Sequence, residues 1–363
     1  MSSVASVRFA RNDDAGFFQE LRKRVDQTLK ENQVSKTGGS RIIGKAIVML
    51  AMYLVPFALL LTVAMPGYLM LVLCVMMGFG LAGIGMSVMH DANHGAFSKS
   101  SWVNKLFGGT LYLLGGNVFG WKVQHNTLHH TYTNILHVDQ DITGKPWLRL
   151  SYADTLKKYH KYQHLYAFFL YSFMTLAFFA KDFKQVFQFN TERKAFIKEF
   201  TTLMIGKILY FGIIIGLPYY FMDITLGQWF LGFFTVQLTA GLIMSTIFQL
   251  AHVVEGADFP EANDEGNLEN TWAIHQIKTT ANFSRKSRIM AWYIGGLNYQ
   301  IEHHLFPNIC HIHYPLISKV VENTAKEYGI NYIVNKNLFT ALGSHIRMLK
   351  DLGRVSDQKL VLA

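Results

Sequence analysis

The sequence predicts an all-α integral membrane protein with four transmembrane helices in two hairpins, a cytoplasmic helical cap and interfacial helices. Only 16% of its 363 residues are charged, whereas about 25% is usual in a soluble domain. Half of the residues are apolar and 14% are aromatic. The apolar residues collect in blocks of about 20 residues, the length of helix that crosses a bilayer. One membrane domain is therefore favoured over two soluble ones.

Four of these apolar blocks are long enough to span the membrane. They are expected at residues 42–64, 68–89, 203–222 and 229–251. The linkers within each pair are very short, so that each pair forms a helical hairpin. Two weaker blocks, Leu106–Gly120 and Leu165–Ala180, are short for a span and are expected to lie in the interface or to re-enter the membrane.

The basic residues indicate the orientation of these spans. None of the 34 Lys and Arg residues lies in either hairpin linker, and almost all lie before the first hairpin, between the hairpins or after the second. The positive-inside rule then places both termini and the large middle segment in the cytoplasm. The net charge of +10 is explained by this orientation and by contact with anionic headgroups. No nucleic-acid partner is expected.

Three segments follow from this organisation. Residues 1–41 form a cytoplasmic N-terminal segment, residues 42–315 the membrane domain, and residues 316–363 a cytoplasmic C-terminal segment. In the first segment, apolar residues repeat at helical spacing and predict an amphipathic helix: Phe18, Leu21, Val25 and Leu29. Such a helix either lies on the membrane or packs on the cytoplasmic domain.

Two further features exclude other classes of protein. No secretory signal peptide is apparent, because the segment before Ile42 is polar and basic and the first apolar stretch is too deep for a cleaved leader. The two cysteines, Cys74 and Cys310, lie far apart and form no CxxC motif. Neither a disulfide framework nor a zinc–thiolate site is therefore predicted.

The histidines carry the strongest signal. Seven of the fifteen fall in three short windows, far more than uniform scattering along the chain would place there. The windows are His90–His94, His125–His130 and His303–His304. The predicted topology puts all three on the cytoplasmic side, together with His252 at the end of the fourth span. Eight histidines are therefore expected to converge beneath the four helices.

The spacing within each window suits metal binding. In HDANH, His90 and His94 are four residues apart, so both imidazoles project from one helix face. In HNTLHH, His125 and His129 repeat this spacing, and His130 is turned by about 100° around the axis. A single zinc site uses three or four ligands, so that eight imidazoles imply two metals.

The identity of the metals is not fixed by ligand type, because neutral imidazole suits Fe, Zn, Cu and Ni. No HExxH motif is present, which excludes the usual zinc protease. An iron pair is favoured, because a cluster beside apolar spans suits oxygen chemistry on a lipid.

The boxes HDANH, HNTLHH and QIEHH, in this order around two hairpins, resemble those of the membrane fatty acid desaturase superfamily. The match runs from about His90 to Pro315, and the hairpins extend it back to about residue 42. The third box, which starts at Gln300, resembles front-end acyl desaturases, which act between an existing double bond and the carboxyl end. The stretches TYTNILHVDQD, WAIHQIKTTANF and NYQIEHHLFPNI are similar to bacterial acyl-CoA or acyl-lipid desaturases of that group.

This resemblance implies a di-iron site with O2 as co-substrate. The implied metal ligands are His90, His94, His125, His129, His130, His252, His303 and His304. Gln300 occupies a place where other desaturases have histidine, and it approaches iron directly, approaches it through water, or packs nearby.

The residues around the ligands receive simpler interpretations. Four carboxylates are candidate acceptors for imidazole N–H groups, or else ordinary solvated acids: Asp91, Asp139, Asp141 and Glu302. The seven remaining histidines are expected to be hydrogen-bonding or surface residues: His137, His160, His164, His275, His311, His313 and His345.

The implied activity is oxygen-dependent introduction of a double bond into a fatty acyl chain, carried on coenzyme A or on a lipid. The double-bond position would follow from how far the chain enters a bent apolar tunnel. The sequence contains no HPGG haem motif, so electrons are expected from a separate protein, either ferredoxin or cytochrome b5 with its reductase.

Two other functions remain open from the residues alone. A fatty acyl hydroxylase or ketolase would use the same metal scaffold. A histidine-lined metal transporter would instead carry polar residues within its spans, and the predicted spans carry almost none.

Overall fold

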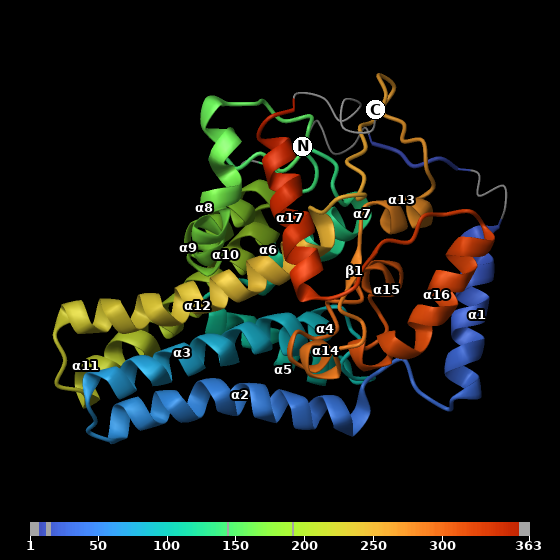
Figure 1. Ribbon diagram of the computed structural model, residues 1–363. Coiled ribbons are helices and arrows are strands. Elements are labelled where there is room, and N and C mark those ends of the chain that lie inside the picture. Colours follow the sequence, from blue (N-terminus) through green and yellow to red (C-terminus); the bar gives the residue numbers. More distant parts are fainter. Residues whose placement is uncertain (1–6, 12–15, 144, 191, 356–363) are drawn as a thin grey trace. The chain divides into compact units, whose positions relative to one another are not determined.

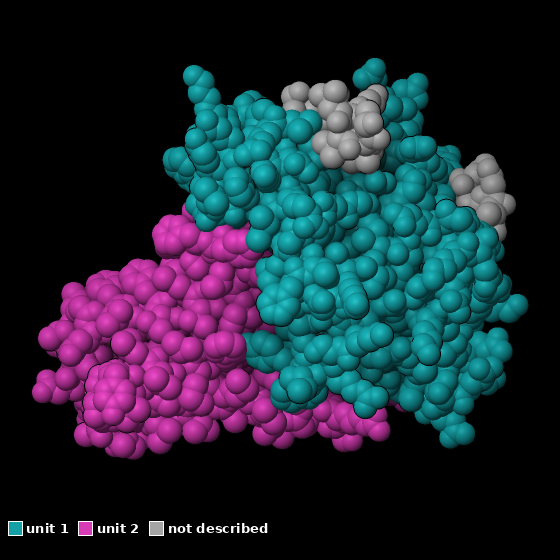
Figure 2. Space-filling model, viewed as in Figure 1, with its two compact units in different colours: residues 1–37, 124–167, 247–363 teal, residues 38–123, 168–246 magenta. Residues whose placement is uncertain are grey.

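The computed structural model describes residues 7–11, 16–143, 145–190 and 192–355, and its regular structure is almost entirely helical (Figure 1). Two compact units make up the chain (Figure 2). Unit 1 comprises Met1–Thr37, Gln124–Ala167 and Ile247–Ala363, and unit 2 comprises Gly38–Val123 and Phe168–Thr246. Four helices are long and apolar enough to cross a membrane: Gly39–Thr62, Gly67–Asn93, Arg193–Phe221 and Leu226–His252. The predicted all-α membrane class with four spans is confirmed.

The first hairpin of unit 2 consists of α2 (Gly39–Thr62) and α3 (Gly67–Gly83). At Gly80 of α3, a Cβ atom would lie 2.7 Å from the backbone of Met52 and Tyr53. Only glycine therefore lets the two helices approach this closely, as small residues do in membrane helix packing. The second span continues from α3 through a π-helical segment, η2 (Ile84–Val88), into α4 (Met89–Asn93), which carries the first histidine box.

The second hairpin begins earlier than the sequence predicted. Its first span combines α10 (Arg193–Phe211), the π-helical segment η6 (Gly212–Gly216) and α11 (Leu217–Phe221). It starts well before residue 203, because the first turns carry Arg and Lys side chains that an apolar window leaves out but a helix accommodates. The second span is α12 (Leu226–His252), which ends on the histidine outside the boxes.

The two weaker apolar blocks form broken helices rather than straight ones, and their predicted place in the interface or in a re-entrant segment stays a prediction. The first is divided among α5 (Ser101–Gly108), the 3₁₀ segment η3 (Gly109–Leu114) and α6 (Val118–Lys122). Gly115 follows η3 with φ 75°, a left-handed conformation that favours glycine. The second consists of α8 (Gln163–Ser172) and α9 (Met174–Phe189), which are bent by 73° at the break between them.

Unit 1 consists of short helices joined by long connections. Its elements include α1 (Phe17–Glu31), η4 (Val123–His129), α7 (His130–Tyr132), η5 (Lys158–Tyr162), α13 (Trp272–Lys278), α14 (Arg288–Tyr293), α15 (Gln300–Leu305), η7 (His311–His313), α16 (Tyr314–Glu327) and α17 (Leu338–Leu352). The strands β1 (Asn282–Phe283) and β2 (Val334–Asn335) pair in parallel.

The N-terminal amphipathic helix buries its apolar face within unit 1, so that the alternative in which this face lies on the membrane is wrong. The apolar side chains of α1 are buried in one core cluster with Ile317, Val321 and Ala325 of α16, and Figure 1 shows the two helices side by side. Arg24 of α1 is paired with Glu327 of α16 at 2.7 Å. Sequence spacing identified the apolar face, but its partner lies near the other end of the chain.

The C-terminal helix α17 holds the chain that follows α12. The Nδ1–H of His345 donates to the carbonyl of Val253 at 2.7 Å, and the hydroxyl of Ser344 accepts from the backbone N–H of Glu255 at 3.0 Å. Arg347 donates to both carboxylate oxygens of Glu255, at 2.8 and 2.6 Å. The segment directly after His252 is thus fixed by three side chains of α17.

Candidate metal centre

Six of the eight predicted ligands lie in unit 1, and all six are buried. The second box lies on η4 and α7, the third box lies on α15, and His252 ends α12. These elements come from three stretches that lie far apart in the chain. Their convergence is a property of the fold and not of local sequence.

Three of these histidines form a compact ligand group. The ligand atoms of His129, His252 and His304 lie within 4.8 Å of one another. Their ring centroids are 4.7 Å apart for His129 and His252, 4.9 Å for His129 and His304, and 5.0 Å for His252 and His304. A metal ion placed among them would meet three imidazole nitrogens.

The other three histidines of unit 1 lie beside this group. The ring centroid of His130 is 4.8 Å from that of His125 and 4.5 Å from that of His303. The Nε2 atoms of His125 and His130 are 3.3 Å apart. The sequence predicted that His130 is turned by about 100° around the axis of a regular α-helix; η4 is π-helical instead, and its i to i+5 geometry brings His125 and His130 to one side.

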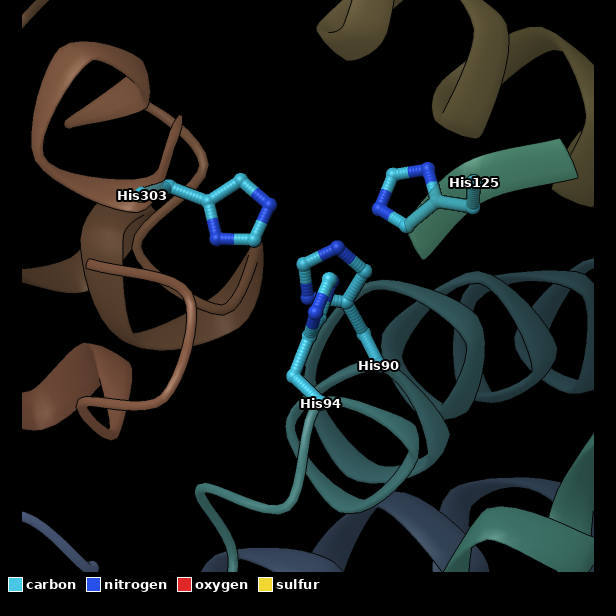
Figure 3. A group of neighbouring side chains, drawn as sticks. All are labelled: His90, His94, His125 and His303. Atoms are coloured by element: carbon cyan, nitrogen blue, oxygen red, sulfur yellow. The ribbon is translucent and has the colours of Figure 1, made fainter. Parts of the chain in front are cut away.

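The first box lies in unit 2. His90 and His94 project from one turn at the end of the second span, with ring centroids 4.8 Å apart, and the ring of Trp121 lies 5.9 Å from each. Figure 3 draws this pair and, from unit 1, His125 and His303. The predicted i, i+4 geometry of HDANH is therefore present.

Hydrogen bonds orient the imidazoles of unit 1. The Nδ1–H of His129 donates to Asp139 at 3.0 Å, and the Nδ1–H of His304 donates to the amide oxygen of Gln276 at 2.8 Å. The Nδ1 of His303 is hydrogen-bonded to the hydroxyl of Tyr314 at 3.1 Å. Each bond leaves the Nε2 atom of the ring for the interior of the cluster. Such outer partners fix the tautomer of a metal-binding histidine and raise its basicity.

The negative charge of Asp139 also strengthens its hydrogen bond to His129. Burial lowers the pKa of the His129 imidazole, but the negative charge of Asp139 and the hydrogen bond to it outweigh burial and raise that pKa. The pKa of the Asp139 carboxyl is lowered, because burial is outweighed by His129 and by the backbone N–H groups of Asp141 and Asn134. Burial lowers the pKa of His304 well below its usual value, and its histidine neighbours add to this effect.

The donor set fits a transition metal. The ligand group of unit 1 consists of imidazoles, which bind Fe, Zn, Cu and Ni. One buried ring nitrogen of this group, Nε2 of His129, has no hydrogen-bond partner among the described residues. Buried polar atoms are normally satisfied, so that this nitrogen indicates that a ligand belongs here.

Gln300 lies within the cluster. Its Nε2 is 3.0 Å from Nε2 of His252 and 3.3 Å from Nε2 of His304, and the residue is only 1% exposed. Its amide oxygen has no hydrogen-bond partner within the described part of the chain. Gln300 therefore packs directly beside two predicted ligands, and its approach to a metal, directly or through water, stays a prediction.

The predicted carboxylate acceptors are partly wrong. Asp139 binds His129, and Asp141 lies 3.5 Å from the same imidazole. Glu302 instead accepts from the amide of Asn282 at 2.8 Å and from the hydroxyl of Tyr332. It therefore holds Asn282, whose side-chain oxygen accepts from the backbone N–H of Ile301 in α15 at 3.0 Å. Asp91 lies 4.0 Å from Nδ1 of His90, beyond hydrogen-bond distance.

Two residues that hydrogen-bond to predicted ligands could not be identified from the sequence. Gln276 and Tyr314 hydrogen-bond to His304 and His303, but neither has a fixed spacing from its histidine in the chain. Gln276 stands in WAIHQIKTTANF, a stretch that carried the resemblance without indicating a role. The seven other histidines lie outside this cluster, and two of them, His275 and His345, bond to backbone carbonyls, as expected.

Asp139→Asn should weaken metal retention by roughly 10- to 100-fold, the usual cost of losing an outer partner of a ligand. Asparagine keeps the shape of the side chain but removes the charge that favours the His129 tautomer. The measurement is metal content per chain after dialysis against a graded series of chelator concentrations. Asp264→Asn, which changes an exposed carboxylate of the same unit, is the control. Equal retention in both variants would contradict the role of Asp139.

Acid should destabilise the protein between pH 6.5 and about 4. Burial lowers the pKa of His275 and of His345 to about 4 in the folded chain, and an unfolded histidine titrates near 6.5. In this range the unfolded state binds more protons, so stability is fully present above pH 6.5 and is lost as the pH falls. The loss amounts to about 3 kcal/mol per histidine.

The check is the thermal midpoint of the purified protein between pH 7 and pH 4. His275→Gln keeps a donor for the carbonyl of Thr133 but does not titrate, and it should flatten the pH dependence. An unchanged slope in this variant would show that His275 does not contribute.

Comparison with known proteins agrees with this geometry. The fatty acid desaturase family model matches residues 66–336. The sn-1 linoleoyl-lipid 6-desaturases of Arthrospira platensis and Synechocystis sp. are 34% and 33% identical to this chain; the matches cover 99% and 98% of this chain and 98% and 100% of the relatives. The acyl-lipid (8-3)-desaturase of Physcomitrium patens is 33% identical over 96% of this chain and 74% of its own length.

A helical membrane fold with a buried cluster of imidazoles therefore occurs together with a family match over most of the sequence. The chain belongs to the fatty acid desaturase family. It is an oxidoreductase that acts on a fatty acyl chain with O2.

Proposed function

We propose that this chain is a front-end desaturase of lipid-linked acyl chains, which inserts a double bond between an existing double bond and the carboxyl end. The observation that carries the metal centre is the convergence of six buried imidazoles in unit 1, three of which place their ligand atoms within 4.8 Å of one another. Two irons are held by eight residues: His90, His94, His125, His129, His130, His252, His303 and His304.

The residues of the chain position this centre. His129, His252 and His304 form one ligand group, His125, His130 and His303 lie beside it, and the first-box pair His90 and His94 brings the proposed ligands to eight. When bound, the two irons supply the oxygen-dependent removal of hydrogen from two adjacent methylenes, which no side-chain acid or base achieves at an unactivated C–H bond. Asp139, Gln276 and Tyr314 hold the imidazoles in the tautomer and orientation that binding needs.

The substrate class is supported by the relatives and by a cavity in unit 2. Two relatives are named linoleoyl-lipid 6-desaturases. The cavity, of about 270 Å³, lies near the two hairpin linkers and is lined mainly by apolar side chains of the four spans, among them Met77 and Phe233. Met77 precedes His90 by thirteen residues of continuous helix, about 20 Å along the axis. A long acyl chain with its methyl end in this cavity reaches the first histidine box.

The enzyme also needs an external source of electrons and a defined orientation in the membrane. A separate redox protein, ferredoxin or cytochrome b5 with its reductase, delivers two electrons for each double bond. Both termini and the histidines face the cytoplasm, because the basic residues avoid both hairpin linkers. The cytoplasmic segments are 1–41 and 316–363, on either side of the membrane domain 42–315.

The test is expression in a host that lacks polyunsaturated fatty acids, with ¹³C-labelled linoleate supplied. Mass spectrometry should locate a new double bond on the carboxyl side of the existing ones, and a short pulse should show it first in intact lipid rather than in acyl-CoA. His303→Ala should give no product.

Two other results would overturn parts of this proposal. A hydroxylated product without a new double bond would identify the hydroxylase or ketolase alternative. A new double bond that appears first in acyl-CoA would overturn the lipid-linked substrate but leave the desaturase activity in place.

A further inference from the structure

We propose that an exposed surface of unit 1 binds the headgroups of anionic phospholipids, independently of the acyl substrate. The surface, called here the lysine surface, is formed by Trp147, Lys157, Lys158, Lys161 and Tyr162. All five side chains are exposed. The lysine surface precedes α8, which is one half of the bent apolar helix pair.

Two tyrosine hydroxyls fix the backbone of the loop that carries Trp147. The hydroxyl of Tyr159 donates to the carbonyl of Pro146 at 2.6 Å, and the hydroxyl of Tyr166 donates to the carbonyl of Trp147 at 2.9 Å. The rings of Trp147 and Tyr159 lie 5.7 Å apart. Although it is anchored in this way, the Trp147 side chain is 62% exposed. The backbone is thus built to present this indole outward.

A second set of contacts ties the same segment to α17. The side chain of Gln163 accepts from the N–H of Arg149 at 2.8 Å and donates to the carbonyl of Leu349 at 2.8 Å. The guanidinium of Arg149, which is 1% exposed, donates to the carbonyls of Leu352 and Val355 at 2.6 Å each. The lysine surface therefore rests on a fixed scaffold, so that little ordering is needed when it binds.

The charge of this surface is strongly positive. Within the described residues, no carboxylate lies at ion-pair distance from Lys157, Lys158 or Lys161. Burial lowers the pKa of the His164 imidazole, and the charges of Arg354, just after α17, and Lys350, in α17, lower it further, so these two cations lie near the lysine surface. The nearby acids, Asp154 and Asp351, are only half-exposed, whereas the five cations are exposed. Each basic residue near an anionic leaflet contributes about 1 kcal/mol to its attraction.

Exposed apolar side chains favour a membrane over a soluble acidic protein as the partner of the lysine surface. Leu165 is 72% exposed and Tyr162 is 52% exposed, and both lie close to Lys161 in the chain. The Lys161 ammonium lies 4.7 Å from the ring of Tyr162. Lysines beside outward-facing Trp, Tyr and Leu at the start of an apolar helix are the pattern of a membrane interface, where the aromatic rings sit at headgroup depth.

Quenching by brominated lipids tests this proposal on the whole protein. The tryptophan fluorescence of the purified protein is titrated in mixed micelles with brominated phosphatidylglycerol or brominated phosphatidylcholine, and a Trp147→Phe variant supplies the signal of the other tryptophans. The Trp147 component should be half-quenched at a concentration of the anionic lipid at least about tenfold lower than that of the zwitterionic lipid. The triple variant K157Q/K158Q/K161Q should lose this difference.

The matched control is R22Q/K23Q/K30Q, which removes the same charge from exposed positions on α1 in the same unit and should keep the difference. Equal quenching by both lipids in the unaltered protein would overturn the proposal. It would also be overturned if the K157Q/K158Q/K161Q variant kept its lipid preference but needed more reduced donor protein for half-maximal activity, because the surface would then bind an acidic protein.

Discussion

Replacing His304 with alanine should abolish double-bond formation and lower the amount of metal that the purified protein retains. His304 belongs to the ligand group with His129 and His252 and is fully buried, so no water-exposed group can take its place. Loss of a direct ligand should exceed the 10- to 100-fold effect of losing an outer partner, so that product should fall by more than about 100-fold. Elemental analysis of the protein and mass spectrometry of its lipids measure the two effects.

The control for this variant is His137→Asn. His137 follows the second box but is exposed, and its φ of 68° is one that asparagine tolerates. It should keep both metal and activity. If His304→Ala retained the full metal content while losing its product, His304 would act on the substrate side and would not be a ligand.

Replacing Lys207 with methionine should lower the free energy of unfolding by about 3–5 kcal/mol. The Lys207 ammonium, on α10, donates to the carboxylate of Asp182 on α9 at 2.6 Å and to the carbonyls of Gly115 and Phe178 at 2.5 and 3.3 Å. The side chains of Lys207 and Asp182 are only 8% and 2% exposed. Methionine leaves the carboxylate buried without its counter-charge, which is expensive inside a membrane protein.

The double variant K207M/D182N separates loss of the ion pair from loss of packing. It removes both charges, and it should recover much of the stability, because a buried pair is often replaceable by neutral groups. The measurement is the thermal midpoint in detergent. If D182N lowered the thermal midpoint of K207M as much as it lowers that of the unaltered protein, the two side chains would not be coupled.

The sequence was sufficient to predict the spans and the histidine boxes, because both depend on local patterns. Apolar blocks of bilayer length predicted four helices, and HDANH predicted two imidazoles on one face. The ion pair of Lys207 with Asp182 could not be predicted, because it depends on how α9 and α10 pack. The partners of α1 and of His304 are likewise set by tertiary contacts, with Gln276 lying 28 residues from its histidine.

Local patterns were also misleading where the backbone departs from an α-helix. The prediction for HNTLHH assumed the regular α-helical turn of about 100° per residue, although it correctly brought His125, His129 and His130 together. The π-helical η4 instead brings the rings of His125 and His130 to a centroid distance of 4.8 Å. This wider turn was not predicted from the sequence.

The family match ends at residue 336, just before α17 begins. This helix nevertheless forms hydrogen bonds to the residues directly after His252, through Ser344, His345 and Arg347. Because α17 holds the residues directly after His252, a predicted metal ligand, we expect docking of α17 and metal binding to be thermodynamically linked, and such linkage is reciprocal. Added metal should shield α17 from proteases, and a cut near Asn337 should loosen the metal even though every histidine box remains. Protease resistance of α17 would then report how much metal the protein holds.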